Sequence, residues 1–140
     1  MKLKITTNYS FSKLSSKIDS LMDGALEEYA SKTEEGSKTK IDRGLRALRP
    51  VTVKIRNYRN QPSKPALKAT GALYNSIKQS GTKLEMLKYG MRHHEGFTTH
   101  PKSLIPNIKV EARPFIKVLQ KDKKVIVKKF TDSLNKSLKK

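Results

Sequence analysis

The segment LSSKIDSLMDGALEEY, residues 14–29, decides the fold because its apolar side chains recur at helical spacing. Charged residues fall between the apolar ones, so one face is apolar and the opposite face is polar. The pattern predicts a long helix that begins after a cap at Ser10 or Ser12 and ends at residues 33–37, where Gly36 follows two glutamates. The apolar positions are Leu14, Ile18, Leu21, Met22, Ala25 and Tyr29.

A second helix is predicted at the other end of the chain, over the lysine-rich residues 121–140. Its apolar side chains are four residues apart and therefore lie on one face, which we expect to pack on a sheet or on a neighbouring subunit. These side chains are Ile126, Phe130, Leu134 and Leu138.

The chain between these helices predicts only short elements. Helical spacing favours two short helices, one over residues 41–48 and one over residues 70–77 that is capped by Thr70 and followed by Gly81. Alternating or apolar runs predict extended pieces at residues 1–5, 51–55, 83–88 and 105–110, and around Phe115. We therefore expect one α+β domain over residues 1–140, with a long N-terminal helix and a C-terminal helix packed on a small antiparallel β-sheet.

Composition predicts a domain with a thin core. Only 35% of the 140 residues are hydrophobic and tryptophan is absent, so partners are expected to cover part of the surface. The absence of cysteine excludes disulfides, thiolate metal sites and cysteine nucleophiles. No apolar run approaches the roughly 20 residues that a membrane-spanning helix needs.

Charge is the most pronounced compositional feature, with 31 Lys and Arg against 12 Asp and Glu. Residues 36–59 hold eight basic residues and one acidic residue, and glycines and prolines punctuate residues 36–69. We expect this region to be a long, basic and mobile loop that contacts a partner. A net charge of +19 attracts nucleic acid, an anionic membrane or an acidic protein surface, and does not choose among them. The candidate contact residues are Arg43, Arg46, Arg49, Arg56, Arg59 and Arg113.

The sequence offers little that resembles catalytic chemistry. His93, His94, Glu95 and His100 could supply metal ligands, but adjacent histidines point in different directions and no second cluster completes the set. A polar turn closed by Gly96 is the favoured interpretation. Paired carboxylates, phosphate-binding loops and nucleophile motifs are also missing. We expect a protein that is not an enzyme and that has no cofactor, no metal and no catalytic residues.

Three short motifs in a fixed order resemble one known family. The run from Lys64 to Ile77 resembles the Leu-x-x-Thr-Gly-x-Leu-x-x-Ser-Ile segment of phage virion morphogenesis proteins, the Mu-like tail-completion family. That family then has a tyrosine followed closely by His or Glu and a Gly, and later an Ala-Arg-Pro-Phe box. Here Tyr89 with His93-His94-Glu95-Gly96 and Ala112-Arg113-Pro114-Phe115 are similar, and the resemblance covers about residues 40–118. Gly90 and Glu111 depart from the family's usual Ala and Pro. The motif residues are Thr70, Gly71, Leu73, Ser76, Ile77, Tyr89, His94, Gly96, Ala112, Arg113, Pro114 and Phe115.

These motif residues are interpreted as structural. Thr70 would cap a helix, Gly71 would allow close packing, and Leu73 and Ile77 would be buried. Pro114 restricts the backbone so that the next residue, Phe115, can point inward. Arg113 would remain free for a partner carboxylate.

The resemblance implies a virion protein that is assembled in the host cytoplasm. It would form a homo-oligomeric ring at the head-proximal end of the tail, or in the neck, and enable head–tail joining. Its partners would be other tail and neck or connector proteins, with non-specific DNA contact in the channel left open and no membrane contact. Two alternatives remain: a basic nucleic-acid-binding module of the ribosomal or architectural type, and a metal-dependent nuclease that uses the histidine cluster.

Overall fold

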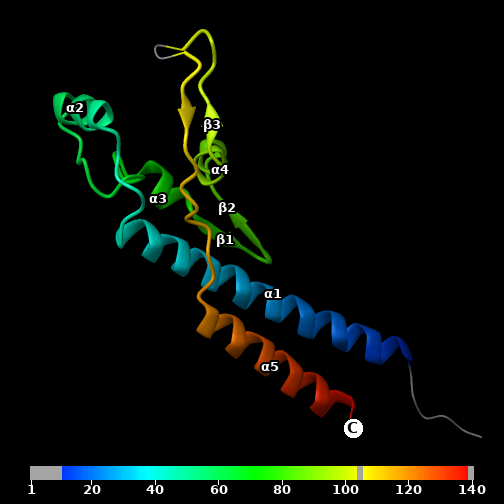
Figure 1. The fold of residues 1–140 in the computed structure, drawn as a ribbon. Helices are drawn as coiled ribbons and strands as arrows, with labels where there is room; N and C mark the ends of the chain where they lie inside the picture. Colours follow the sequence, from blue (N-terminus) through cyan, green and yellow to red (C-terminus); the bar gives the residue numbers. More distant parts are fainter. Residues whose placement is uncertain (1–10, 104–105, 139–140) are drawn as a thin grey trace, which may run out of the picture.

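The computed structural model describes residues 11–103 and 106–138 and confirms the predicted α+β class (Figure 1). The predicted strand over residues 1–5 lies outside the described residues. The elements in chain order are α1 (Phe11–Asp42), α2 (Pro50–Tyr58), α3 (Ala72–Ser76), β1 (Lys78–Ser80), β2 (Lys83–Glu85), α4 (Lys88–Glu95), β3 (Phe97–Thr98), β4 (Lys109–Val110) and α5 (Gln120–Leu138).

The first and last helices, α1 and α5, run side by side in opposite directions (Figure 1). Ile126 of α5 is buried, and Lys129 forms an ion pair with Glu28 of α1, with 2.6 Å between Nζ and Oε1. The C-terminal helix therefore packs on α1 rather than on a sheet. With 32 residues, α1 is the longest helix of the described chain, and α5 lies along it.

Helix α1 is longer than predicted and continues through residues 33–37 to Asp42. Within this predicted end, Gly36 and Ser37 are small and lie where the chain before α5 crosses the helix. A Cβ atom on Gly36 would lie 2.2 Å from the carbonyl oxygen of Lys117. Ser37 donates its hydroxyl to the Thr33 carbonyl and accepts from the Lys117 amide at 3.4 Å. Small side chains thus allow two backbones to pack closely, and this contact overrides the local end signal.

The prediction that the basic middle of the chain forms one long loop is wrong. Its first part, including Ile41, belongs to α1, and residues 50–58 form α2 rather than a strand. Pro50 occupies the first turn of α2, where its missing N–H costs nothing. Leu45 and Leu48 lie outside any helix, so the predicted helix over residues 41–48 does not form.

The strands form two separate antiparallel pairs instead of one sheet. Lys78 pairs with Glu85 in the β1–β2 hairpin, and Phe97 pairs with Val110 in the β3–β4 hairpin. Gly81 is part of the turn between β1 and β2, with φ of 57°, and does not end α3. The β1–β2 hairpin packs on α1, whereas the β3–β4 hairpin points away from it (Figure 1).

The core lies between the C-terminal half of α1 and the segments that cross it. Its buried residues are Ile41, Leu73, Ile77 and Phe115. The burial of Leu73, Ile77 and Phe115 confirms the predicted inward orientation of these three motif residues. The surrounding half-buried side chains are Leu45, Leu67, Tyr74, Leu84, Met86 and Ile116.

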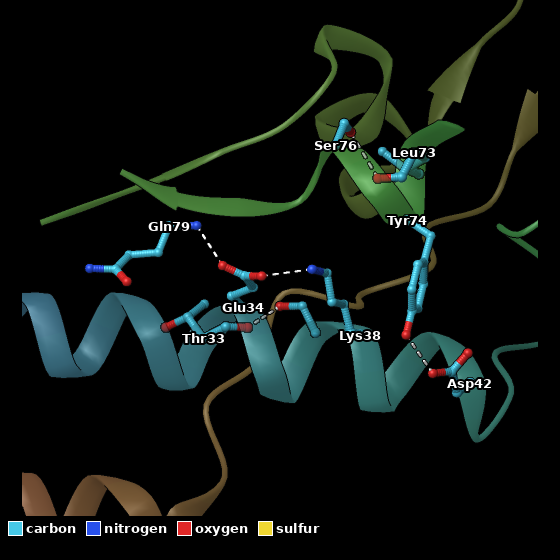
Figure 2. A network of polar contacts seen from close by, with 9 residues as sticks. Thr33, Glu34, Lys38, Asp42, Leu73, Tyr74, Ser76 and Gln79 are labelled. Carbon is cyan, nitrogen blue, oxygen red and sulfur yellow. Dashed lines mark hydrogen bonds and ion pairs between the residues drawn. The ribbon is translucent and has the colours of Figure 1, made fainter. Parts of the chain in front are cut away.

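A polar network attaches α3 and β1 to α1 (Figure 2). The Glu34 carboxylate accepts from the Lys38 ammonium and from the Gln79 amide, both at 2.6 Å, and these hydrogen bonds lower the pKa of Glu34. The Tyr74 hydroxyl donates to Asp42 at 2.8 Å, which raises the pKa of Tyr74. These side chains are at least partly solvated, so the contacts specify position more than they add stability.

No helix among the described residues combines the length and the apolar character needed to cross a membrane.

Candidate functional site

A cleft of about 770 Å³ is lined by residues of α2, of the segments before and after it, and of β4 and the chain that flanks β4. Its apolar lining includes Leu48, Val51, Leu67 and Val110. Five cationic side chains and a single carboxylate also line it: Arg46, Arg49, Arg56, Lys109, Arg113 and Glu111.

Two of these arginines connect the segment before α2 to the β3–β4 hairpin. Arg46 forms an ion pair with Glu111, and Arg49 donates to the Lys109 carbonyl at 3.4 Å. Arg49 and Lys109 are 60 residues apart in the sequence, so these contacts join distant segments across the cleft.

Arg56 lies on the face of α2 that lines the cleft, and its side chain has a structural role. Its guanidinium donates to the carbonyl oxygens of Pro62, Pro65 and Ala66. These bonds fold the chain after α2 back onto the helix and form the cleft wall. Burial lowers the pKa of Arg56, and the neighbouring Arg113 lowers it further. An arginine nevertheless stays protonated in a protein, so Arg56 keeps its charge beside the cleft.

His93 and Arg113 lie together at the end of the cleft nearest the core. Burial lowers the pKa of His93, and the charges of Arg113 and Arg56 lower it further, so the imidazole is neutral at pH 7. Its ring packs edge-on between Tyr89 and Phe97, at centroid distances of 6.0 and 5.4 Å. Among the described residues, two buried side-chain nitrogens have no hydrogen-bond partner: His93 Nδ1 and Arg113 Nε.

The three motifs of the family resemblance meet beneath this cleft. His94 Nδ1 accepts from the backbone amides of Phe115 and Ile116, each at 3.2 Å, and its ring packs edge-on against Phe115. A Cβ atom on Gly90 would lie 2.7 Å from Leu73, so α4 packs closely on the Thr-Gly segment. Residues of all three motifs therefore contact one another.

Two motif glycines have a clear steric role. Gly96 has φ of 83°, and a Cβ atom there would lie 2.7 Å from the Ala112 amide. Gly71 has φ of 77° and occupies the N-cap position of α3. The sequence-based prediction that Thr70 occupies this position is therefore wrong. Positive φ, rather than the close packing expected at Gly71, explains glycine at that position. Thr70 contributes a long contact of 3.4 Å from the Ala72 amide to its hydroxyl.

Ser76 links α3 to the chain that precedes α4. Its hydroxyl donates to the Leu73 carbonyl at 2.8 Å (Figure 2) and accepts from the Leu87 amide at 3.1 Å. Ala112 and Pro114 are exposed, and Tyr89 lines the cleft.

The structure brings together four of the six arginines that the sequence singled out. Arg46, Arg49, Arg56 and Arg113 line the cleft, whereas Arg43 and Arg59 are exposed outside it. Nothing in the sequence places Lys109 at the site, and His93 is indicated there only as a potential metal ligand and as part of the second family motif. The alternation of apolar and charged residues in Ile108-Lys109-Val110-Glu111 supports the extended piece predicted at residues 105–110, but it does not indicate that this strand borders the site.

The histidines do not form one cluster. His94 Nδ1 is occupied by backbone amides, His100 Nδ1 accepts from the Lys102 amide, and His93 faces the cleft. His93, His94 and Glu95 belong to the last turns of α4, so the predicted polar turn is wrong. In the described chain, no three His, Asp or Glu side chains converge as a metal site would require.

We expect His94→Ala to lower the free energy of unfolding by about 1–2 kcal/mol, because two backbone amides lose their acceptor. Equilibrium urea unfolding measures the change. His100→Ala is the matched control, since that ring is exposed and supports only a local turn. Equal losses in the two variants would show that the His94 contacts do not stabilise the core.

Comparison of the chain with protein-family models, with curated proteins and with solved structures gave no match.

Proposed function

We propose that this protein is a non-enzymatic structural component of a bacteriophage particle, of the tail-completion or neck kind. It acts by protein–protein contact at the head-proximal end of the tail, where it enables head–tail joining. The proposal rests on the three motifs of the resemblance and on the observation that they pack on one another. Leu73, His94 and Phe115 come from the three different motifs. His94 accepts a hydrogen bond from the Phe115 amide, and Leu73 packs in the core with Phe115 and against α4, the helix that carries His94.

The shape of the molecule supports a role that depends on partners. The N-terminal half of α1 and the helix α5 extend beyond the rest of the domain as a two-helix arm (Figure 1). Several large apolar side chains on this arm are exposed: Met22, Leu26, Tyr29, Val125 and Val127. These residues lie on both helices of the arm, and exposed apolar side chains of this size are typical of surfaces that other proteins cover when they form a patch.

The chemistry of the cleft also favours binding over catalysis. Glu111 is its only carboxylate and is held by Arg46, so no second carboxylate is near for acid–base work. Nδ1 of His93 has no hydrogen-bond partner to orient the ring toward a nucleophile. A cleft with cationic and apolar walls can hold an anionic segment of a partner.

A nucleic-acid-binding module is the second candidate, and the exposed end of α2 favours it. The Tyr58 ring is 91% exposed and is followed directly by the exposed Arg59. A free aromatic ring beside cations is suited to stacking on bases and to phosphate contact. RNA or DNA that copurifies without nuclease treatment and dissociates as salt rises would support this alternative.

Removal of the gene tests the proposed function directly. In a phage that lacks it, electron microscopy of lysates should show full heads and separate tails that do not unite. A plasmid copy of the gene should restore joined particles, and mass spectrometry should find the chain in purified virions. Joined particles without the gene, or empty heads with blocked DNA packaging, would contradict the assignment.

A further inference from the structure

The cleft contains a group of positive charges that the described chain does not neutralise. Arg113 is half-buried, and its Nε atom is shielded from solvent and has no hydrogen-bond partner among the described residues. Arg56 is close enough that its pKa is lowered by Arg113. The carbonyl oxygens of Pro62, Pro65 and Ala66 offset the charge of Arg56, whereas Nε of Arg113 has no such acceptor in the described chain.

The only carboxylate of the cleft does not compensate Arg113. Glu111 pairs with Arg46 at the exposed edge, and both of these side chains are largely solvated. A partly desolvated guanidinium without a counter-charge is unfavourable, and a carboxylate that reaches it gains a charge-assisted hydrogen bond in a low-dielectric site. The arrangement is therefore incomplete without an anion.

The lining of the cleft distinguishes between the anions that could enter. Leu48, Val51 and Leu67 provide apolar walls, and a volume of about 770 Å³ accommodates several side chains. A nucleic-acid backbone is dominated by charged phosphates and offers little apolar surface for such walls, so it is better served by the exposed cations outside the cleft, such as Arg43 and Arg59. A peptide can place a carboxylate on Arg113 and aliphatic side chains against the walls at the same time.

We infer that the cleft is a docking site for an acidic and aliphatic peptide segment of a neighbouring protein, with one carboxylate of that segment bound by Arg113. That the neighbour is a tail or neck protein rests on the function proposed above, whereas the peptide site itself does not. His93 borders the same pocket and reports on its occupancy.

Binding of a synthetic peptide to the full chain tests the site. The probe is acetyl-Leu-Glu-Asp-Leu-Glu-Val-amide, and isothermal titration calorimetry measures its affinity. Arg113→Gln should weaken binding by about tenfold or more, because it removes the charge from a partly desolvated pair. Arg43→Gln removes the same charge from an exposed position outside the cleft, and should weaken binding by less than about twofold. Arg113→Lys keeps the charge but loses the bidentate geometry, and should give an intermediate affinity.

A second measurement on the unaltered protein does not depend on how the variants fold. NMR titration of the imidazole should show that saturating peptide raises the pKa of His93, since a bound carboxylate opposes the charges of Arg113 and Arg56. The other ionisable groups around this pocket are Arg46, Arg49, Tyr89, Lys109 and Glu111. The same peptide with Gln and Asn in place of Glu and Asp should leave the His93 pKa unchanged.

Three outcomes would overturn the inference. The affinity for the peptide could fall equally in the Arg113→Gln and Arg43→Gln variants, which would show that binding depends only on the net charge of the protein. The peptide could leave the His93 pKa unchanged. Or single-stranded oligothymidine could depend on Arg113 more strongly than the peptide does, which would make the cleft a nucleic-acid site. Joined particles in the phage without the gene would remove the proposed function and leave peptide binding intact, so the two failures are distinguishable.

Discussion

Phe115→Ala is expected to lower the free energy of unfolding by about 3–5 kcal/mol, because a fully buried aromatic side chain is replaced by a cavity. The Phe115 ring is 0% exposed and packs in the core with Ile41, Leu73 and Ile77. It also contacts the His94 ring, and its backbone amide donates to that same histidine. One substitution therefore weakens the contact between two of the three motifs.

Equilibrium urea unfolding followed by circular dichroism gives the size of this effect. Tyr58→Ala is the matched control, since it removes an aromatic ring that is 91% exposed, and it should change stability by no more than about 0.5 kcal/mol. A loss at Phe115 as small as the loss at Tyr58 would show that the ring is not part of the core in solution.

Gly36→Ala and Gly24→Ala are expected to have opposite effects, although both replace a glycine in α1. Alanine is favoured over glycine inside a helix by about 1 kcal/mol, so Gly24→Ala should stabilise the protein, because a Cβ atom there has no neighbour within 4 Å. At Gly36 the new Cβ atom would lie 2.2 Å from the Lys117 carbonyl oxygen, which is backbone and cannot rotate away. The overpacking cost of about 3 kcal/mol exceeds the gain in helix propensity, so we expect a net loss of about 2 kcal/mol.

Thermal and urea unfolding of the two variants side by side measures the difference, which should be about 3 kcal/mol between them. The unaltered chain lies between the variants. If both substitutions stabilise the protein equally, the chain before α5 does not cross α1 at Gly36, and the arrangement of the two longest helices is incorrect.

Elements with a strong local signal could be predicted from the sequence. The α5 stripe of Ile126, Phe130 and Leu134 has one spacing and no competing pattern, and the segment from Thr70 to Ile77 combines a helix start with two apolar residues four apart. Both form helices close to their predicted bounds. The burial of Phe115 was also predictable, because Pro114 restricts the backbone so that the next side chain can point inward.

The end of α1 could not be predicted, because its signal depends on a distant segment. Gly36 and Ser37 are typical of helix ends when read locally. In the structure they are the positions where the backbone of Lys117 approaches, 80 residues later in the sequence. A small residue gives the same local sequence pattern whether it ends a helix or lies where another backbone segment packs closely on that helix.

The candidate site was only partly predictable for a related reason. The alternation of Val51, Val53 and Ile55 indicates a strand, and β-branched residues support it. The helical α2 is stabilised instead by tertiary contacts, in which the Arg56 guanidinium donates to three carbonyl groups. The arginines could be identified from the sequence as candidate contact residues. Only the folded structure distinguishes those that line the cleft from those that are exposed to solvent outside it.

The pairing of α1 with α5 also sets an order in which parts of the protein form and open. Glu28 and Lys129 are 101 residues apart, so their contact closes a loop of most of the chain, whereas Ile41, Leu73 and Ile77 meet over much shorter separations. Loop closure costs more entropy as the loop lengthens, and α5 has one buried apolar side chain among its described residues, Ile126, to offset that cost. Helix α5 is therefore expected to dock last during folding and to detach first by local unfolding, while the domain that carries the cleft stays intact.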